Sequence, residues 1–199
     1  MNTVATLLVL TVIALTAAAA LYSNFRLGID RNAVYGSVDQ VSWLLEDRHS
    51  IIEAIKDIAD HAEATPGHDE LKDLGLTLAK ARRALTEFSS KDLSPDITAQ
   101  VSTVENAVVD SLKALLLELD SDTAITNDVS YGNRRRQLHR RSANLEEAVD
   151  AYNIQARVYQ QRMGLPWVRP FASLFGHDSV GELDIATEAT LFTEPVSSP

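Results

Sequence analysis

Cysteine is absent from this sequence of 199 residues, which excludes a disulfide framework, a thiolate metal site and a cysteine nucleophile. Basic residues are scarce relative to acidic ones, 18 against 28, so the formal net charge is −10. That charge argues against nucleic acid as the main partner, because neutralising phosphates requires a basic surface. Glycine and proline are also few, and the plentiful alanine, leucine, glutamate and arginine favour helix.

Recognisable catalytic and metal-binding patterns are missing as well. The five histidines are scattered, at positions 49, 61, 68, 139 and 177, with no pair at helical ligand spacing. Glu46-x-x-His49 occurs once, whereas a carboxylate-bridged metal bundle needs this motif on two helices and two further glutamates. We interpret Glu46 and His49 as exposed polar residues. With no phosphate loop or nucleophile elbow, the sequence predicts a non-enzymatic protein without a cofactor or metal.

Charge is also absent from one long stretch at the start of the chain. From Thr3 to Leu21 every side chain is uncharged, and the first charged residue is Arg26. A run of about 20 apolar or small residues is long enough to cross a bilayer. A cleaved signal peptide is the alternative, since alanines at 17–19 suit a peptidase, but no basic residue precedes the run. We therefore expect a transmembrane anchor over residues 1–25, with residues 3–25 in the bilayer.

The arginines that follow this span indicate its orientation. Arg26 and Arg31 lie after it, and no lysine or arginine precedes it. Because basic residues favour the cytoplasmic side, we expect a single-pass protein of the inner (plasma) membrane with the bulk of the chain in the cytoplasm.

Beyond the anchor, apolar residues recur at three- and four-residue steps in four segments. These segments cover about 30–62, 66–89, 94–119 and 131–163. Thr65-Pro66 and Ser94-Pro95 each place a capping hydroxyl before a first-turn proline. The breaks between segments are short, so neighbouring helices should be antiparallel. The predicted fold is all-α: an N-terminal transmembrane helix, with Gly28 as the one candidate break, followed by an up-down bundle of about four long helices over residues 26–163.

The chain changes character after Met163. Residues 164–176 form an aromatic, proline-punctuated juxtamembrane segment. If this segment is helical, one face carries Trp167, Phe171, Leu174 and Phe175. That face could lie on the membrane surface, or it could fold back and cap the bundle by packing Trp167 and Phe171 against Tyr159. Residues 177–199 contain five acidic and no lysine or arginine side chains, so we expect a disordered acidic tail.

Two sets of charged residues call for an explanation. The first is a basic cluster in the fourth segment, consisting of Arg134, Arg135, Arg136, Arg140 and Arg141. An up-down arrangement puts this cluster at the tip far from the membrane, where it either forms local salt bridges or docks an acidic protein partner. The second is Arg48, which falls between Leu45 and Ile52 on an apolar stripe. Its guanidinium needs a carboxylate or several carbonyls as partners, unless its stem reaches the bundle edge.

An aromatic–amide pair occurs twice in the last segment. Tyr152-Asn153 and Tyr159-Gln160 stand seven residues, or two helical turns, apart, so both rings share one helix face. The simplest interpretation is a bundle seam whose hydroxyls reach the rim. Leu165-Pro166 and Ala172-Ser173-Leu174-Phe175-Gly176 follow the two pairs.

This order of residues resembles the C-terminal signature of the LemA family, which repeats Tyr-Asn and continues with Phe-Pro and Ala-x-x-Phe-Gly-Phe. Val38-Asp39, Arg48 and Ile51-Ile52 are similar to the first soluble helix of that family. Gln160, Leu165 and His177 depart from the pattern. The resemblance covers the anchor, the first bundle segment and residues 148–176, and it implies a divergent, membrane-anchored helical protein without catalytic residues.

Together these features predict a scaffold or interaction module at the inner membrane. The alternative is an extracytoplasmic ligand-binding or sensory helical domain, although such a sensor usually has a second span to carry its signal. The sequence names no protein partner, and it leaves open whether the chain forms a homo-oligomer.

Overall fold

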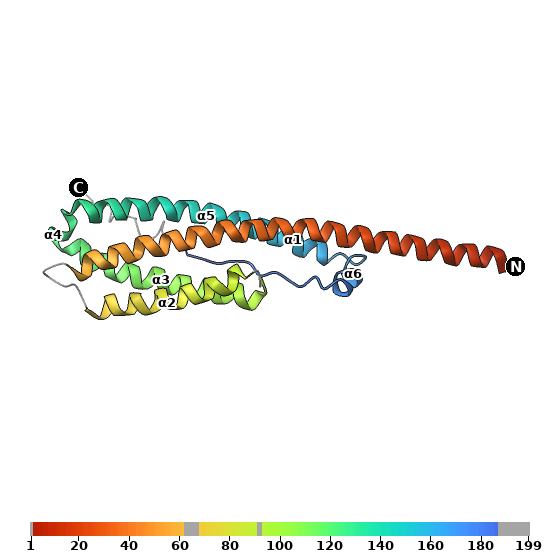
Figure 1. Cartoon of the computed structure of the whole chain (residues 1–199), viewed down its shortest axis with the longest axis horizontal. Helices are drawn as coiled ribbons and strands as arrows, with labels where there is room; N and C mark the ends of the chain where they lie inside the picture. The colour runs from red at the N-terminus through yellow and green to blue at the C-terminus, as the bar shows by residue number, and fades with distance from the viewer. Residues whose placement is uncertain (1, 62–67, 91–92, 187–199) are drawn as a thin grey trace, which may run out of the picture.

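The computed structural model describes residues 2–61, 68–90 and 93–186, and these residues contain six helices and no strand (Figure 1). The helices are α1 (Asn2–Asp60), α2 (His68–Ser89), α3 (Pro95–Ser121), α4 (Thr123–Thr126), α5 (Val129–Met163) and α6 (Arg169–Leu174). The predicted all-α fold with an N-terminal apolar helix and four long helices is confirmed.

Helix α1 joins the apolar span to the bundle without interruption. It is 59 residues long and continues through Gly28, so the candidate break is not used. Its N-terminal end projects beyond the other helices (Figure 1), and the helix is long and apolar enough to cross a membrane. None of the side chains in its most apolar 18-residue window is buried, as expected for a segment that faces lipid.

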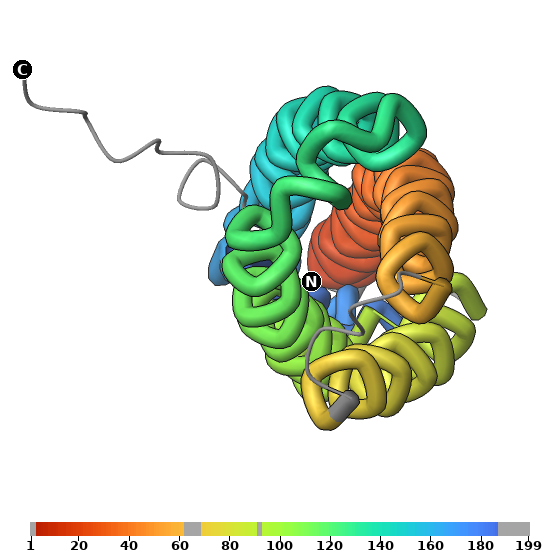
Figure 2. The backbone as a smooth tube through the Cα atoms, turned by 90° about the vertical axis from the view of Figure 1, so that its left-hand side faces the viewer, coloured from red at the N-terminus to blue at the C-terminus, as the bar shows by residue number. Residues whose placement is uncertain are grey.

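The four long helices surround the core in the order α5, α1, α2 and α3 when seen along the bundle axis (Figure 2). Helix α1 packs mainly along α5, and α2 packs mainly along α3. Among the described helices, α3 and α5 are not one of the closely packed pairs. The side of the bundle between these two helices is therefore open to another segment of the chain.

The core consists of two apolar clusters separated by a polar layer. One cluster lies near the base, the end of the bundle from which α1 projects, and includes Leu45 and Leu145. The other lies near the opposite end, the tip, and includes Ile52 and Leu138. Buried polar residues fall between the two clusters along α1, α3 and α5, namely Arg48, His49, Glu105 and Ser142.

Local capping explains where several helices begin. The predicted start of α3 is confirmed, because Ser94 accepts a hydrogen bond from the backbone N–H of Ile97 and Pro95 occupies the first turn. Asp122 and Asp128 cap α4 and α5 in the same way. Thr65-Pro66, the predicted start of α2, lies outside the described residues.

The prediction of a disordered tail over residues 177–199 is wrong for its first part. Residues 177–186, which we call the strap, run back along the bundle from α6 in an extended conformation (Figure 1). Val180, Leu183 and Ile185 of the strap are buried in the basal core cluster. The strap is ordered because the open side of the bundle supplies the apolar surface that an isolated segment lacks. Residues 187–199 lie outside the described residues.

Candidate functional site

The strap lies between α3 and α5, and the two tyrosines of α5 bind its backbone. The Tyr152 hydroxyl donates to the carbonyl of Gly181 at 2.8 Å, and the Tyr159 hydroxyl donates to the carbonyl of Asp178 at 3.2 Å. Both rings are fully buried, and Tyr152 makes an edge contact with Phe88 at 5.8 Å between ring centroids. The seven-residue spacing therefore fits the tyrosines to an extended segment as well as to the bundle seam.

Burial fixes the protonation state of these hydroxyls. It raises the pKa of Tyr159 to about 12, and burial together with the charge of Glu182 raises the pKa of Tyr152 further. Both phenols thus keep their protons at physiological pH and remain hydrogen-bond donors. The tyrosines therefore serve as hydrogen-bond donors to the strap at neutral pH.

The side-chain amides beside the tyrosines bind the strap as well. The Asn153 side chain binds both backbone groups of Leu183. Its oxygen accepts a hydrogen bond from the Leu183 N–H, and its nitrogen donates one to the Leu183 C=O, each at 2.8 Å. The side chain of Gln160 donates to the carbonyl of Val180. Each aromatic–amide pair of α5 is therefore a unit that recognises extended backbone.

Helix α3 and the residues just before it hold the opposite edge of the strap. Ser102 accepts from the N–H of Asp184 at 2.9 Å. Asn106 donates to the carbonyl of Asp184 at 3.0 Å and accepts from the N–H of Ala186 at 2.6 Å. The carbonyl of Leu93 accepts from the N–H of Gly181 at 2.9 Å. The strap is thus hydrogen-bonded from both sides, in the manner of a strand added to a sheet edge, although its partners here are mostly side chains.

Gly181 of the strap packs closely against the first turn of α3. A Cβ atom at this position would lie 1.8 Å from the Thr98 hydroxyl oxygen and 2.8 Å from the Cα of Pro95. No larger residue fits without moving backbone. The groove therefore selects for a glycine at this point, with apolar residues at the buried positions 180, 183 and 185.

Gly176 and His177 direct the chain into the groove. Gly176 has φ +67, the left-handed conformation that ends many helices, and the N–H of His177 bonds back to the carbonyl of Ala172. The ring of His177 donates from Nε2 to the Asn24 side-chain oxygen of α1 at 3.0 Å. Burial lowers the pKa of His177, and the nearby charge of Arg31 lowers it further, so the neutral ring fits this position.

A second polar site lies inside the bundle, where Arg48 and His49 of α1 both contact Glu105 of α3. Arg48 forms an ion pair with Glu105 Oε2, and His49 Nε2 lies 2.9 Å from Oε1. All three side chains are at most 1% exposed. Arg48 is therefore paired in the core, and the alternative in which it reaches the bundle edge is wrong. The interpretation of His49 as an exposed residue is also wrong.

The ionised form of Glu105 is the one that this layer favours. Burial alone raises the pKa of the Glu105 carboxyl, but the hydrogen bond from His49 and the charge of Arg48 outweigh it, so the pKa lies below its ordinary value. The sequence held a signal for this partner, because Glu105 follows Val101 and Val104 and precedes Val108 on the apolar stripe of α3.

The basic cluster lies at the far tip, as predicted, and part of it forms local contacts. Arg135 pairs with Asp120, which also accepts from the Tyr131 hydroxyl. Arg141 pairs with Asp47 and stacks over the Trp43 ring. The other contacts of the cluster stay within α5, from Arg134 to Gln137 and from Arg136 to Asn133. Arg140 is exposed. Docking of an acidic partner here stays a prediction.

The juxtamembrane segment folds back onto α1 and still exposes aromatic residues. Val168 and Ala172 are buried, and α6 packs against α1. Trp167 is half exposed, and Leu174 and Phe175 are exposed, while Phe171 is partly buried. The segment therefore folds back onto the bundle, and its contact with a membrane surface stays a prediction.

The remaining residues of the resemblance have structural positions of their own. Val38 is fully buried in the basal cluster, and Asp39 and Pro166 are exposed. Neither a family model, nor a curated protein, nor a solved structure matches this chain.

The described residues hold no metal-binding cluster, and a further cavity lies near the tip. No three histidine, aspartate or glutamate side chains among them lie where they could share a metal ion. A cavity of about 460 Å³ lies between α1 and α2 and is lined by charged residues that include the ion pair of Glu53 and Arg82. It contains no nucleophile beside a base.

Proposed function

We propose that this protein is a membrane-anchored, non-enzymatic interaction module of the LemA type, whose groove between α3 and α5 binds extended peptide segments. The observation that carries the proposal is the two-sided recognition of the strap backbone, in which Asn153 and Asn106 each make two hydrogen bonds to it. Main-chain recognition with pockets for alternate side chains is a recurrent way of binding peptides. In this proposal the strap is the resident occupant.

The chemistry of the groove defines the segment that would compete with the strap. Such a segment is extended, has a glycine where Gly181 packs on Thr98, and carries apolar residues in place of Val180, Leu183 and Ile185. A tethered strap acts at a millimolar effective concentration, so a competitor must be locally abundant or bind more tightly. Anchoring in the same membrane supplies local abundance.

Exchange of the strap tests this function. A specific protease site placed after Gly176 of the full chain in detergent allows the strap to be cut after the protein has folded. We expect a labelled peptide of residues 177–186 to bind the cut protein, and the same peptide with Gly181→Ala to bind at least tenfold more weakly because its Cβ meets Thr98. Equal binding of the two peptides, or no binding of the first, would contradict the proposal.

The proposal places the protein in the inner membrane with the bundle in the cytoplasm. Arg26 and Arg31 after the apolar half of α1 support this orientation. A fluorescent protein that matures only in the cytoplasm should be fluorescent when fused to the C-terminus. Alkaline phosphatase fused at the same place should be inactive. The reverse pattern would put the bundle on the other side and favour a sensory domain.

A further inference from the structure

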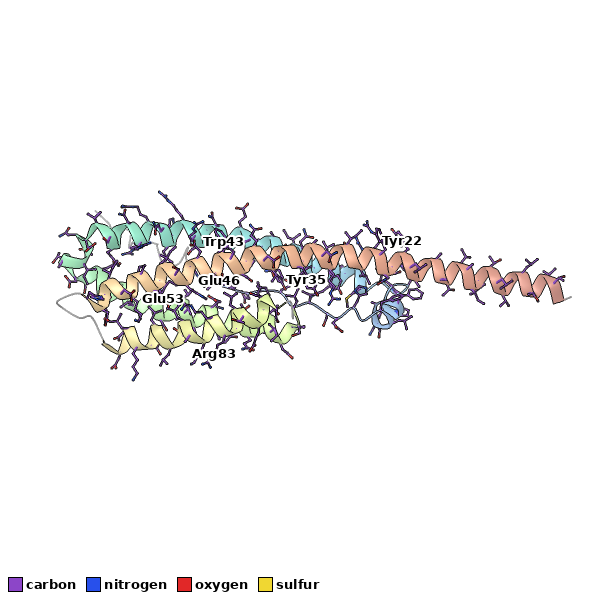
Figure 3. All side chains as sticks on the ribbon, viewed as in Figure 1. Tyr22, Tyr35, Trp43, Glu46, Glu53 and Arg83 are labelled. Atoms are coloured by element: carbon purple, nitrogen blue, oxygen red, sulfur yellow. The ribbon has the colours of Figure 1, made fainter. Side chains whose placement is uncertain are left out.

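The base of the bundle contains a cavity where α1 leaves the other helices. Its volume is about 160 Å³, and its walls come from α1, the end of α5 and the loop before α6. Polar and aromatic side chains line it, including Tyr22, Ser23, Arg26, Arg162 and Trp167. Figure 3 shows Tyr22 on the part of α1 that emerges from the bundle.

The apolar span sets the depth of this cavity relative to the bilayer. The 19 residues Thr3–Leu21 of α1 cover roughly 28 Å at 1.5 Å per residue, close to the ~30 Å of a hydrocarbon core. Tyr22 to Arg26 therefore lie just outside the hydrocarbon, at the level of the lipid headgroups. The half-exposed indole of Trp167 lies beside the same cavity and suits this depth.

The charge around the cavity has the opposite sign to that of the whole chain. Residues 22–31 and 162–178 contain four arginines and two aspartates, whereas the chain as a whole carries −10. Arg162 forms an ion pair with Asp30, and the Arg162 side chain is only partly exposed. Arg26 is half-buried in the cavity wall and forms no ion pair with any residue of the described chain.

We propose that this cavity binds the phosphate group of an anionic phospholipid. Arg26 supplies the charge. Tyr22, Ser23 and Arg162, whose guanidinium is paired with Asp30, line the same cavity. The acyl chains would continue along the exposed apolar face of α1, where Leu21 and Phe25 are each about two-thirds exposed. The cavity exceeds the roughly 30 Å³ share of one water several-fold, so a phosphate fits with bound water. This site is separate from the groove between α3 and α5.

Native mass spectrometry of the full chain in detergent tests the proposal by lipid titration. At least one phosphatidylglycerol should bind per chain. Phosphatidylcholine should bind more weakly, because its choline cation would lie near the guanidinium of Arg26. Arg26→Gln should lower the phosphatidylglycerol affinity about tenfold, the loss of one charge-assisted hydrogen bond. Arg83→Gln makes the same charge change on the exposed face of α2 and should leave the affinity unchanged (Figure 3).

Two further measurements identify the source of the phosphate and check that the variant is folded. Inorganic phosphate at millimolar concentration should not displace the lipid, and displacement would show a free-anion site in place of a lipid site. Circular dichroism of Arg26→Gln should match the unsubstituted protein. Equal lipid affinity for Arg26→Gln and Arg83→Gln, or equal binding of the two lipids, would overturn the proposal.

Discussion

Glu105 is the residue that connects the polar layer of the core, because it is the shared acceptor for Arg48 and His49. A buried ion pair of this kind adds little net stability over apolar packing, but the loss of one partner leaves the other charge stranded. The three side chains therefore differ in what their removal costs, and these differences can be measured.

Removal of the acid should cost more than removal of the guanidinium. Glu105→Leu strands the Arg48 cation in the core and should destabilise the protein by about 3–5 kcal/mol. Arg48→Met should be milder, because Glu105 keeps His49 as its partner. The double substitution should recover much of the loss caused by Glu105→Leu. Denaturant unfolding of the full chain in detergent measures all three, and equal small effects of both single changes would contradict the pairing.

The Glu105 carboxylate makes the free energy of unfolding depend on pH in the acidic range. Because the folded pKa of Glu105 lies below its ordinary value of 4.5, its contribution is complete above pH 4.5 and is lost as the pH falls towards the folded pKa. Glu105→Gln lacks this titration. We expect the difference in unfolding free energy between the two proteins to shrink as the pH falls from 7 to below 4.5. A constant difference would show that Glu105 titrates normally when folded.

At the scale of elements, each of the four long helices could be predicted from its own apolar stripe, and the short helix α4 and the strap could not. Residues 177–186 carry acidic residues and short apolar side chains, which describe a disordered tail when considered alone. Their order depends on Asn153, Gln160 and Asn106, which lie on other elements. The repeat of Tyr152 and Tyr159 was visible in the sequence, but the segment that they bind was not. The partner of Arg48 also lies on another helix, and the only signal for it in the sequence was the place of Glu105 on the apolar stripe of α3.

Two glycine-to-alanine substitutions compare a helix position with open space around it and a strap position without such space. Gly36 lies in α1, and no atom comes within 4 Å of the place that an added methyl group would occupy. Gly36→Ala should therefore stabilise the protein by roughly 0.5–1 kcal/mol through helix propensity. Gly181→Ala makes the same chemical change and should destabilise it, because the Cβ meets Thr98. Thermal unfolding compares the pair, and a neutral Gly181→Ala would mean that the strap does not pack closely on α3.

At the scale of the whole molecule, α1 is both the apolar span and the central wall of the bundle. Because α1 has no break between its apolar half and the bundle, the proposed membrane anchor and the bundle share one continuous helix. The base is basic and aromatic, whereas the rest of the chain is acidic. These features suit a module that is held upright on a membrane with its groove turned to the side.

Hydrogen exchange at the strap tests the central claim most directly. Asn153, Ser102, Asn106 and the carbonyl of Leu93 accept hydrogen bonds from four strap amides, those of Gly181, Leu183, Asp184 and Ala186. In the full chain we expect these amides to exchange far more slowly than an unstructured segment does. Asn153→Ala should speed exchange across the strap, while Asn133→Ala, on the exposed face of the same helix, should not. Unprotected strap amides in the unsubstituted protein would contradict the account.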